Sequence, residues 1–167
     1  MKIIAIDPGY ERLGIAVMEK IDGKEVLLYS SCFITSKDLA HHERLTLVGN
    51  EVERIIKEYK PQALAIEKLF FSKNQKTALM VAETRGVILY TASRLGLSVS
   101  EYLPVDIKIA VTGYGKSDKN HIIAMVPKLV KITKKIQYDD EYDAIACGIT
   151  YFAHGLPRGE VTRLSTA

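Results

Sequence analysis

Two acidic residues each end a short, wholly apolar run of the chain. Asp7 follows residues 3–6, and Glu67 follows residues 64–66. Such runs are typical of central strands that are covered on both faces of a sheet. If these strands are parallel neighbours, their ends lie ~4.8 Å apart and both side chains reach one edge of the sheet. Two carboxylates that meet there repel each other, so they need a cation between them, or one of them takes up a proton.

Two further acids, Asp140 and Asp143, stand three residues apart in a predicted helix and therefore share one helical face. Because no Cys or His accompanies these oxygen ligands, the set favours Mg²⁺ or Mn²⁺ over Zn²⁺. Four carboxylates are enough to hold two ions ~4 Å apart, which supports in-line attack on a phosphodiester. Each acid also has a structural explanation, since Asp7 fits a turn at Asp7-Pro8-Gly9 and Asp139 or Asp140 fits a helix N-cap.

Lysines concentrate in two stretches of the chain. Seven lysines and one acid, Asp118, lie between positions 108 and 135, so this stretch carries +6 against +3 for the whole chain. A second stretch, residues 68–76, interleaves three lysines with Phe70 and Phe71. Clustered lysines are typical of a phosphate-binding surface, and an exposed phenylalanine between them stacks on an unpaired base for ~1–3 kcal/mol. The alternative is that the lysines form only a solvated helix face.

The remaining pattern predicts an α/β domain that positions these residues. Apolar and alternating runs predict strands at residues 2–6, 12–19, 25–33, 63–67 and 97–103, with a hairpin turn at Asp22-Gly23. Helices are predicted at residues 38–59, 76–95, 104–113 and 140–154, with another after Asp118 that Pro127 interrupts. Gly86, inside the helix at 76–95, suggests close helix packing. This order of elements predicts a mixed sheet flanked by helices.

Length and composition bound the class of protein. The 167 residues fit one domain at ~150 residues per domain, which we expect to span residues 1–155 and to leave 156–167 as a tail without periodicity. Apolar residues make up 47% and charged residues 26%, which excludes disorder, collagen and coiled coil. Cys32 and Cys147 lie too far apart for a thiolate motif. With no signal peptide and no apolar run long enough to cross a bilayer, we expect a cytoplasmic protein without a membrane partner.

The ordered set of motifs resembles the RuvC-type Holliday junction resolvases over residues 1 to about 154. The matching stretches are Ile6-Asp7-Pro8-Gly9 with Gly14, Ala65-Ile66-Glu67 followed by Phe70-Phe71, Glu83-Thr84-Arg85-Gly86, Gly113-Tyr114-Gly115 with Lys119, and Asp140-Glu141-Tyr142-Asp143-Ala144. The first motif alone is weak, since some sugar-kinase-like ATPases begin similarly, whereas the set at these spacings is specific.

The resemblance implies a ribonuclease H-like fold, a homodimer, and nicking of two opposed strands of a four-way DNA junction in recombination and repair. It also implies two Mg²⁺ ions in each active site, with Mn²⁺ as a substitute, and a branch-migration complex of the RuvA–RuvB type as a partner. The implied metal ligands and catalytic residues are Asp7, Glu67, Asp140 and Asp143, which selects Asp140 over Asp139.

The resemblance also concerns contacts with DNA. It places Phe70 at the family's junction-inserting aromatic, and Lys108 and Lys119 at its basic residues near the scissile phosphate. Further candidates for DNA binding are Phe71, Lys73, Lys76 and Lys116. Lys68 and Tyr142 depart from the family pattern, which has Gln and a small residue there. Two other functions stay open, a non-catalytic junction-binding protein and a ribonuclease H-like nuclease that acts on RNA.

Overall fold

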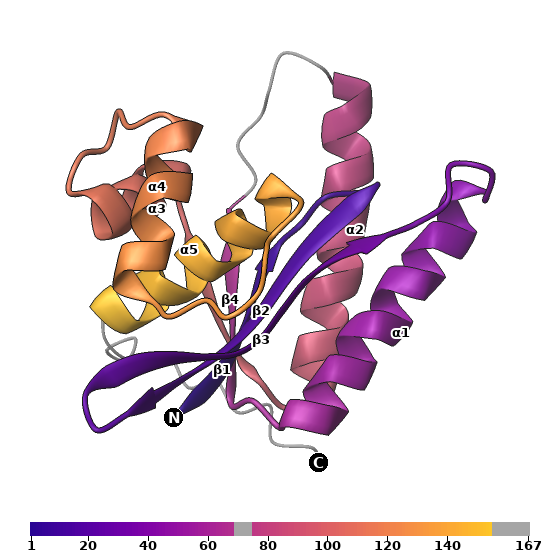
Figure 1. The fold of residues 1–167 in the computed structure, drawn as a ribbon. Helices are drawn as coiled ribbons and strands as arrows, with labels where there is room; N and C mark the ends of the chain where they lie inside the picture. Colours follow the sequence, from indigo (N-terminus) through magenta and orange to yellow (C-terminus); the bar gives the residue numbers. More distant parts are fainter. Residues whose placement is uncertain (69–74, 155–167) are drawn as a thin grey trace.

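The computed structural model describes residues 1–68 and 75–154, without the side chains of residues 75–77. Five strands form one sheet in the order β3-β2-β1-β4-β5 (Figure 1). They are β1 (Lys2–Asp7), β2 (Arg12–Ile21), β3 (Lys24–Ile34), β4 (Ala63–Glu67) and β5 (Ser98–Tyr102). The pairs β1–β2 and β2–β3 are antiparallel, whereas β1–β4 and β4–β5 are parallel. The mixed sheet predicted from the sequence is confirmed.

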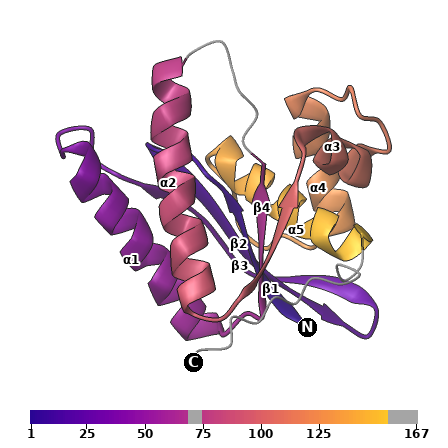
Figure 2. The same cartoon turned by 180° about the vertical axis from the view of Figure 1, so that it is seen from behind.

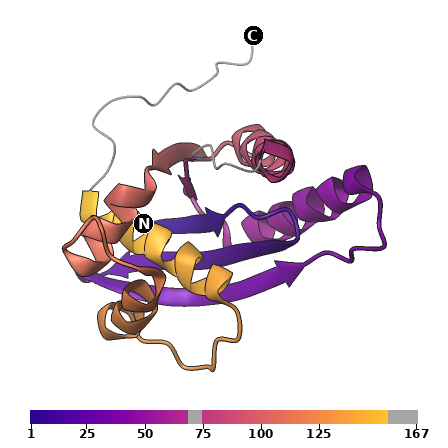
Figure 3. The same cartoon turned by 90° about the horizontal axis from the view of Figure 1, so that it is seen from above.

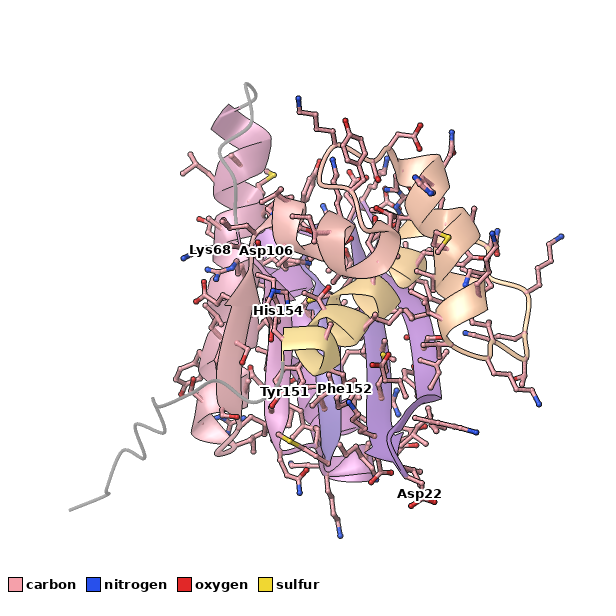
Figure 4. The ribbon with its side chains drawn as sticks, turned by 90° about the vertical axis from the view of Figure 1, so that its left-hand side faces the viewer. Asp22, Lys68, Asp106, Tyr151, Phe152 and His154 are labelled. Atoms are coloured by element: carbon pink, nitrogen blue, oxygen red, sulfur yellow. The ribbon has the colours of Figure 1, made fainter. Side chains whose placement is uncertain are left out.

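The turn between β2 and β3 lies at Asp22 and Gly23, as predicted. Both residues have positive φ, 50° for Asp22 and 79° for Gly23, and a two-residue hairpin turn of this kind needs positive φ at both positions. Asp22 lies at the opposite end of the molecule from Lys68, the residue after β4 (Figure 4). The hairpin tip is therefore remote from the sheet edge where the predicted acids lie.

Helices cover both faces of the sheet (Figures 2 and 3). One face carries α1 (His41–Tyr59) and α2 (Gln75–Arg94), and the other carries α3 (Pro104–Thr112), α4 (Lys119–Leu129) and α5 (Asp139–His154). Alternate residues of β1 divide between two cores, Ile4 and Ile6 on the first face and Ile3 and Ala5 on the second. All four are fully buried, which explains the continuous apolar run. Within residues 1–68 and 75–154, no helix is both long and apolar enough to span a bilayer.

Helix α4 corrects one prediction, because it continues through Pro127 to Leu129. Pro127 lies in the last turn, where its ring removes a single backbone hydrogen bond. Val126 and Val130 are both buried in the core, and the Val130 N–H still donates to the Val126 carbonyl at 3.0 Å. Packing of the two valines therefore carries the helix past the proline.

Candidate active site

Asp7 and Glu67 are the last residues of β1 and β4. The two strands are parallel neighbours, with Ile6 opposite Ile66 in the register. Asp7 and Glu67 therefore leave the sheet at the same edge, and the parallel pairing on which the sequence analysis depended is confirmed. Lys68, which follows Glu67, is exposed at this end of the sheet (Figure 4).

Asp7 takes part in a turn and also keeps its carboxylate available. The Gly9 N–H donates to the backbone carbonyl of Asp7 at 3.1 Å, so the turn uses the main chain rather than the side chain. A Cβ on Gly9 would lie 2.0 Å from the carbonyl oxygen of Arg12, and this close approach requires glycine. The structural explanation for Asp7 and a chemical role are therefore compatible.

The first turn of α5 lies directly against β2 at Gly14. A Cβ on Gly14 would be 1.9 Å from the carbonyl oxygen of Asp140 and 3.2 Å from Cβ of Asp7. Gly14 pairs with Asp7 in the sheet register, so this contact brings the start of α5 beside the end of β1. Asp140 and Asp143 reach the acids of the sheet because Gly14 has no side chain.

Burial raises the pKa of all four acids, and nearby acids add to the shift. Burial raises the pKa of Asp7 well above its usual range, and the charges of Asp143, Glu67 and Asp140 raise it further. Burial also raises the pKa of Glu67, with a second contribution from the charge of Asp143. The pKa values of Asp140 and Asp143 are raised by burial as well. Such shifts are typical of carboxylates that share a site with too little compensating positive charge.

Two basic side chains lie among the acids. Lys119 Nζ is 2.5 Å from Asp139 Oδ2 and 3.0 Å from Asp143 Oδ2. Burial opposes the charged form of Lys119, but hydrogen bonds to both carboxylates raise its pKa overall. Arg12 Nε is 3.1 Å from Asp140 Oδ2. The sequence analysis identified Lys119 and missed Arg12, because a single arginine at the start of a strand forms no pattern.

A cleft of about 210 Å³ opens beside the acids. Glu67 and Asp143 line it together with Lys108 of α3 and Lys119 of α4, and three apolar or proline side chains complete it, Pro104, Ile107 and Ile122. The two lysines that the resemblance placed near the scissile phosphate therefore share a cleft with two of the four acids. Lys116 is exposed between α3 and α4.

Most of the other candidates for DNA binding lie where the structure does not describe their side chains. Phe70, Phe71 and Lys73 lie outside the described residues, and Lys76 belongs to α2 but its side chain lies outside the description. Tyr142 packs against the core on the α5 face of the sheet. The tyrosine therefore fills space where the family pattern has a smaller residue.

The motif Glu83-Thr84-Arg85-Gly86 acquires a structural role that its sequence did not reveal. Arg85 Nε donates to the backbone carbonyl of Glu67 at 3.3 Å, and the Arg85 guanidinium lies 2.5 Å from Glu101 Oε2. Arg85 therefore connects α2 to the ends of β4 and β5, at the edge of the sheet where Glu67 lies.

The donor set fits a hard divalent cation. Asp140 Oδ2 is buried, and its contact with Arg12 Nε at 3.1 Å is an ion pair without hydrogen-bond geometry. Burial raises the pKa of the Cys147 thiol, and the charges of Glu67 and Asp7 raise it further, so this sulfur stays protonated and is a poor metal ligand. In the part of the chain that the structure describes, no three acidic, His or Cys side chains already form a metal cage. Asp143 and Asp140 instead form ion pairs with Lys119 and Arg12. A divalent cation would relieve the remaining repulsion between the carboxylates.

Comparisons with known proteins show which family this chain is similar to. The family described as "Crossover junction endodeoxyribonuclease RuvC" matches residues 3–151. A protein of that description from Thermosipho melanesiensis is 45% identical over 87% of this chain and 93% of its own length. Another from Fusobacterium nucleatum is 40% identical over 90% of this chain and 80% of its own length. The structure of Thermus thermophilus RuvC in complex with a Holliday junction substrate superposes with a TM-score of 0.82, at 28% identity, over 90% of this chain and 92% of the other.

Proposed function

The chain belongs to the RuvC family of crossover junction endodeoxyribonucleases, and we propose that it resolves four-way DNA junctions by hydrolysing phosphodiesters on two opposed strands. The observation that carries the proposal is the meeting of acids from β1, β4 and α5 beside two lysines of one cleft. A solved relative in complex with Holliday junction substrate supports junction DNA as the ligand. We expect this activity in the cytoplasm, in recombination and repair.

Nucleases of this family depend on metal ions. Asp7, Glu67, Asp140 and Asp143 would hold two Mg²⁺ ions, or Mn²⁺ as a substitute, which would supply Lewis-acid activation of water and of the leaving oxygen. The chain itself contributes the converging carboxylates and a cation, Lys119, whose raised pKa keeps it charged. Lys108 and Lys119 then bind and orient the phosphate beside the acids.

One incubation separates the alternatives. Purified protein is mixed with a labelled synthetic four-way junction and Mg²⁺, with a linear duplex and an RNA duplex as matched controls. We expect paired nicks at symmetric positions of the junction, with 5′-phosphate and 3′-hydroxyl ends, and little cleavage of either control. Binding without nicks would favour a non-catalytic protein, and cleavage of the RNA duplex would favour the ribonuclease.

Junction affinity, measured in a chelator, is expected to fall steeply with salt. Each lysine–phosphate contact releases condensed counterions with a slope of about −0.9 in log affinity against log salt. Lys108→Ala or Lys119→Ala should therefore flatten the slope by about one contact and slow cleavage. Lys57→Ala is the matched control, because Lys57 is an exposed lysine of α1 on the opposite face of the sheet. Equal slopes for all four proteins would contradict the assigned phosphate contacts.

Helix α2 is the candidate surface for a homodimer. Leu79 and Tyr90 are 66% and 68% exposed, and with Glu83 and Gly86 they stand at helical spacing along one face. The close packing that Gly86 predicts has an alternative explanation, in which Gly86 packs α2 onto its own sheet. Among residues 1–68 and 75–154, a Cβ on Gly86 would meet no atom within 4 Å, which argues against packing of Gly86 on the sheet. A branch-migration complex of the RuvA–RuvB type is the further partner that family membership suggests.

We expect light scattering at micromolar concentration to give about 37 kDa, twice the 18.6 kDa of the chain. Two active sites related by a two-fold axis suit two cuts in a nearly symmetric junction. Gly86→Leu should shift the mass toward the monomer without unfolding it, because a Cβ at this position meets no described atom within 4 Å. Lys57→Leu on α1 is the control for added bulk. A monomeric wild type that still makes paired nicks would exclude the dimer.

A further inference from the structure

An ion pair between the buried Glu141 and the half-exposed Lys134 connects the start of α5 to the edge strand β3. Glu141, the third residue of α5, is 5% exposed. Lys134 Nζ lies 2.6 Å from Glu141 Oε1 and donates a hydrogen bond of 2.6 Å to the backbone carbonyl of Ser30. We call this arrangement of Lys134, Glu141 and the Ser30 carbonyl the Lys134 brace.

The brace connects three parts of the chain, namely β3, the segment between α4 and α5, and the first turn of α5. Ser30 lies in the edge strand β3, which contributes none of the candidate ligands. Lys134 lies in residues 130–138, between α4 and α5, which form neither helix nor strand. A cleft of about 340 Å³ separates residues 27–30 from residues 131–134. Leu27 and Ile132 pack against the same core, and the ion pair and its hydrogen bond add polar contacts beside this cleft.

We propose that Lys134 and Glu141 are positioning residues that hold the first turn of α5 so that Asp140 and Asp143 face the acids of the sheet. Glu141 immediately follows Asp140, so a shift of its side chain moves the same helical turn. An unpaired carboxylate buried at this place is costly, which gives Glu141 a strong preference for the position that Lys134 defines. The inference rests on the proposed metal site, and it assigns a role in that site to two residues that touch no metal.

Charge and position have opposite effects at Lys134, which makes the inference testable. A positive charge near the acids weakens their attraction for a cation, so removing it should by charge alone tighten Mg²⁺ binding. Loss of a partner that orients a metal ligand instead weakens metal affinity or activity, typically by about 10–100-fold. Whether Mg²⁺ binding becomes tighter or weaker when Lys134 is replaced therefore separates the two effects.

The test uses the full chain and Mg²⁺ alone, by titration calorimetry, with Mn²⁺ alone as a second probe. We expect Lys134→Met to bind Mg²⁺ about 10-fold more weakly and to need more Mg²⁺ for half-maximal junction cleavage, while the rate at saturating Mg²⁺ approaches that of the wild type. Lys134→Arg should restore the wild-type Mg²⁺ requirement. Lys135→Met is the matched control, because it removes an exposed neighbouring charge without touching the brace.

Some outcomes overturn the inference. If folded Lys134→Met binds Mg²⁺ as tightly as the wild type or more tightly, the brace has no positioning role. If that variant does not fold, the charge-balanced pair Lys134→Met with Glu141→Gln leaves no unpaired carboxylate, and it must still show weaker Mg²⁺ binding. Failure of the proposed function is distinguishable, because the wild type itself would then show no Mg²⁺-dependent cleavage.

Discussion

Asp7→Asn is expected to lower junction cleavage by about 10³-fold or more, because bound metal supplies several kcal/mol of transition-state stabilisation and each ~1.4 kcal/mol is tenfold in rate. Junction affinity in a chelator should stay close to that of the wild type, since the lysines and the shape of the surface are unchanged. The same split is expected for Glu67→Gln, Asp140→Asn and Asp143→Asn.

Asp139→Asn is the matched control for this series. Asp139 stands next to Asp140, but hydrogen bonding to Lys119 lowers the pKa of its carboxyl, whereas the pKa of Asp140 is raised by burial. We therefore expect Asp139→Asn to keep most of the cleavage and Asp140→Asn to lose it. Near-normal nicking by any variant of the four proposed ligands would remove that residue from the metal site.

Asp7→Asn should also stabilise the folded protein in the absence of metal. Burial and the neighbouring acids raise the pKa of Asp7 in the folded state above its unfolded value, so the stability that its protonation contributes is lost as the pH rises through the raised pKa. Asp7→Asn avoids that loss. Its melting temperature should therefore exceed that of the wild type increasingly as pH rises above about 4, and added Mg²⁺ should narrow the difference. A lower melting temperature for the variant at pH 8 would contradict the crowding of the acids.

Local patterns were enough to predict most of the scaffold. The apolar runs before Asp7 and Glu67 identified two central strands, and Asp22-Gly23 identified the hairpin turn, because each depends on neighbouring residues alone. The continuation of α4 through Pro127 was missed, since burial of Val126 and Val130 outweighs a cost that is visible in the sequence.

The surroundings of the acids could not be predicted in the same way. Arg12 reaches Asp140, and Lys134 reaches Ser30 across 104 residues of chain, and both contacts exist only after the sheet and α5 have packed. Gly14 appeared in the motif, but nothing in the sequence says that its missing side chain makes room for the backbone of Asp140. Residue type and spacing indicated the acidic ligand candidates, and the family resemblance selected Asp140 over Asp139, whereas what orients these side chains depends on tertiary contacts.

Gly14→Ala is expected to have the second large effect, a loss of cleavage of about 100-fold with weaker Mg²⁺ binding, as when the partners that orient a metal ligand are removed. A Cβ at this position would lie 1.9 Å from the carbonyl oxygen of Asp140 and 2.6 Å from its carbonyl carbon. Gly14 itself is held on both sides, by Asp7 of β1 and Cys32 of β3. Because the strand is fixed by two neighbours, the first turn of α5 must move away, and Asp140 moves with it.

Gly148→Ala is the matched control, because Gly148 lies on the same helix and also faces the sheet closely. Its Cβ would meet Met18 Sδ at 2.5 Å, the far end of a flexible side chain that adjusts more easily than backbone. Both variants should unfold at lower temperature, since overpacking a core typically costs about 1–3 kcal/mol. Only Gly14→Ala should also change Mg²⁺ affinity, measured by calorimetry well below its melting temperature. If the two variants lose stability equally and both keep wild-type Mg²⁺ affinity and cleavage, the contact at Gly14 supports the fold and does not position Asp140.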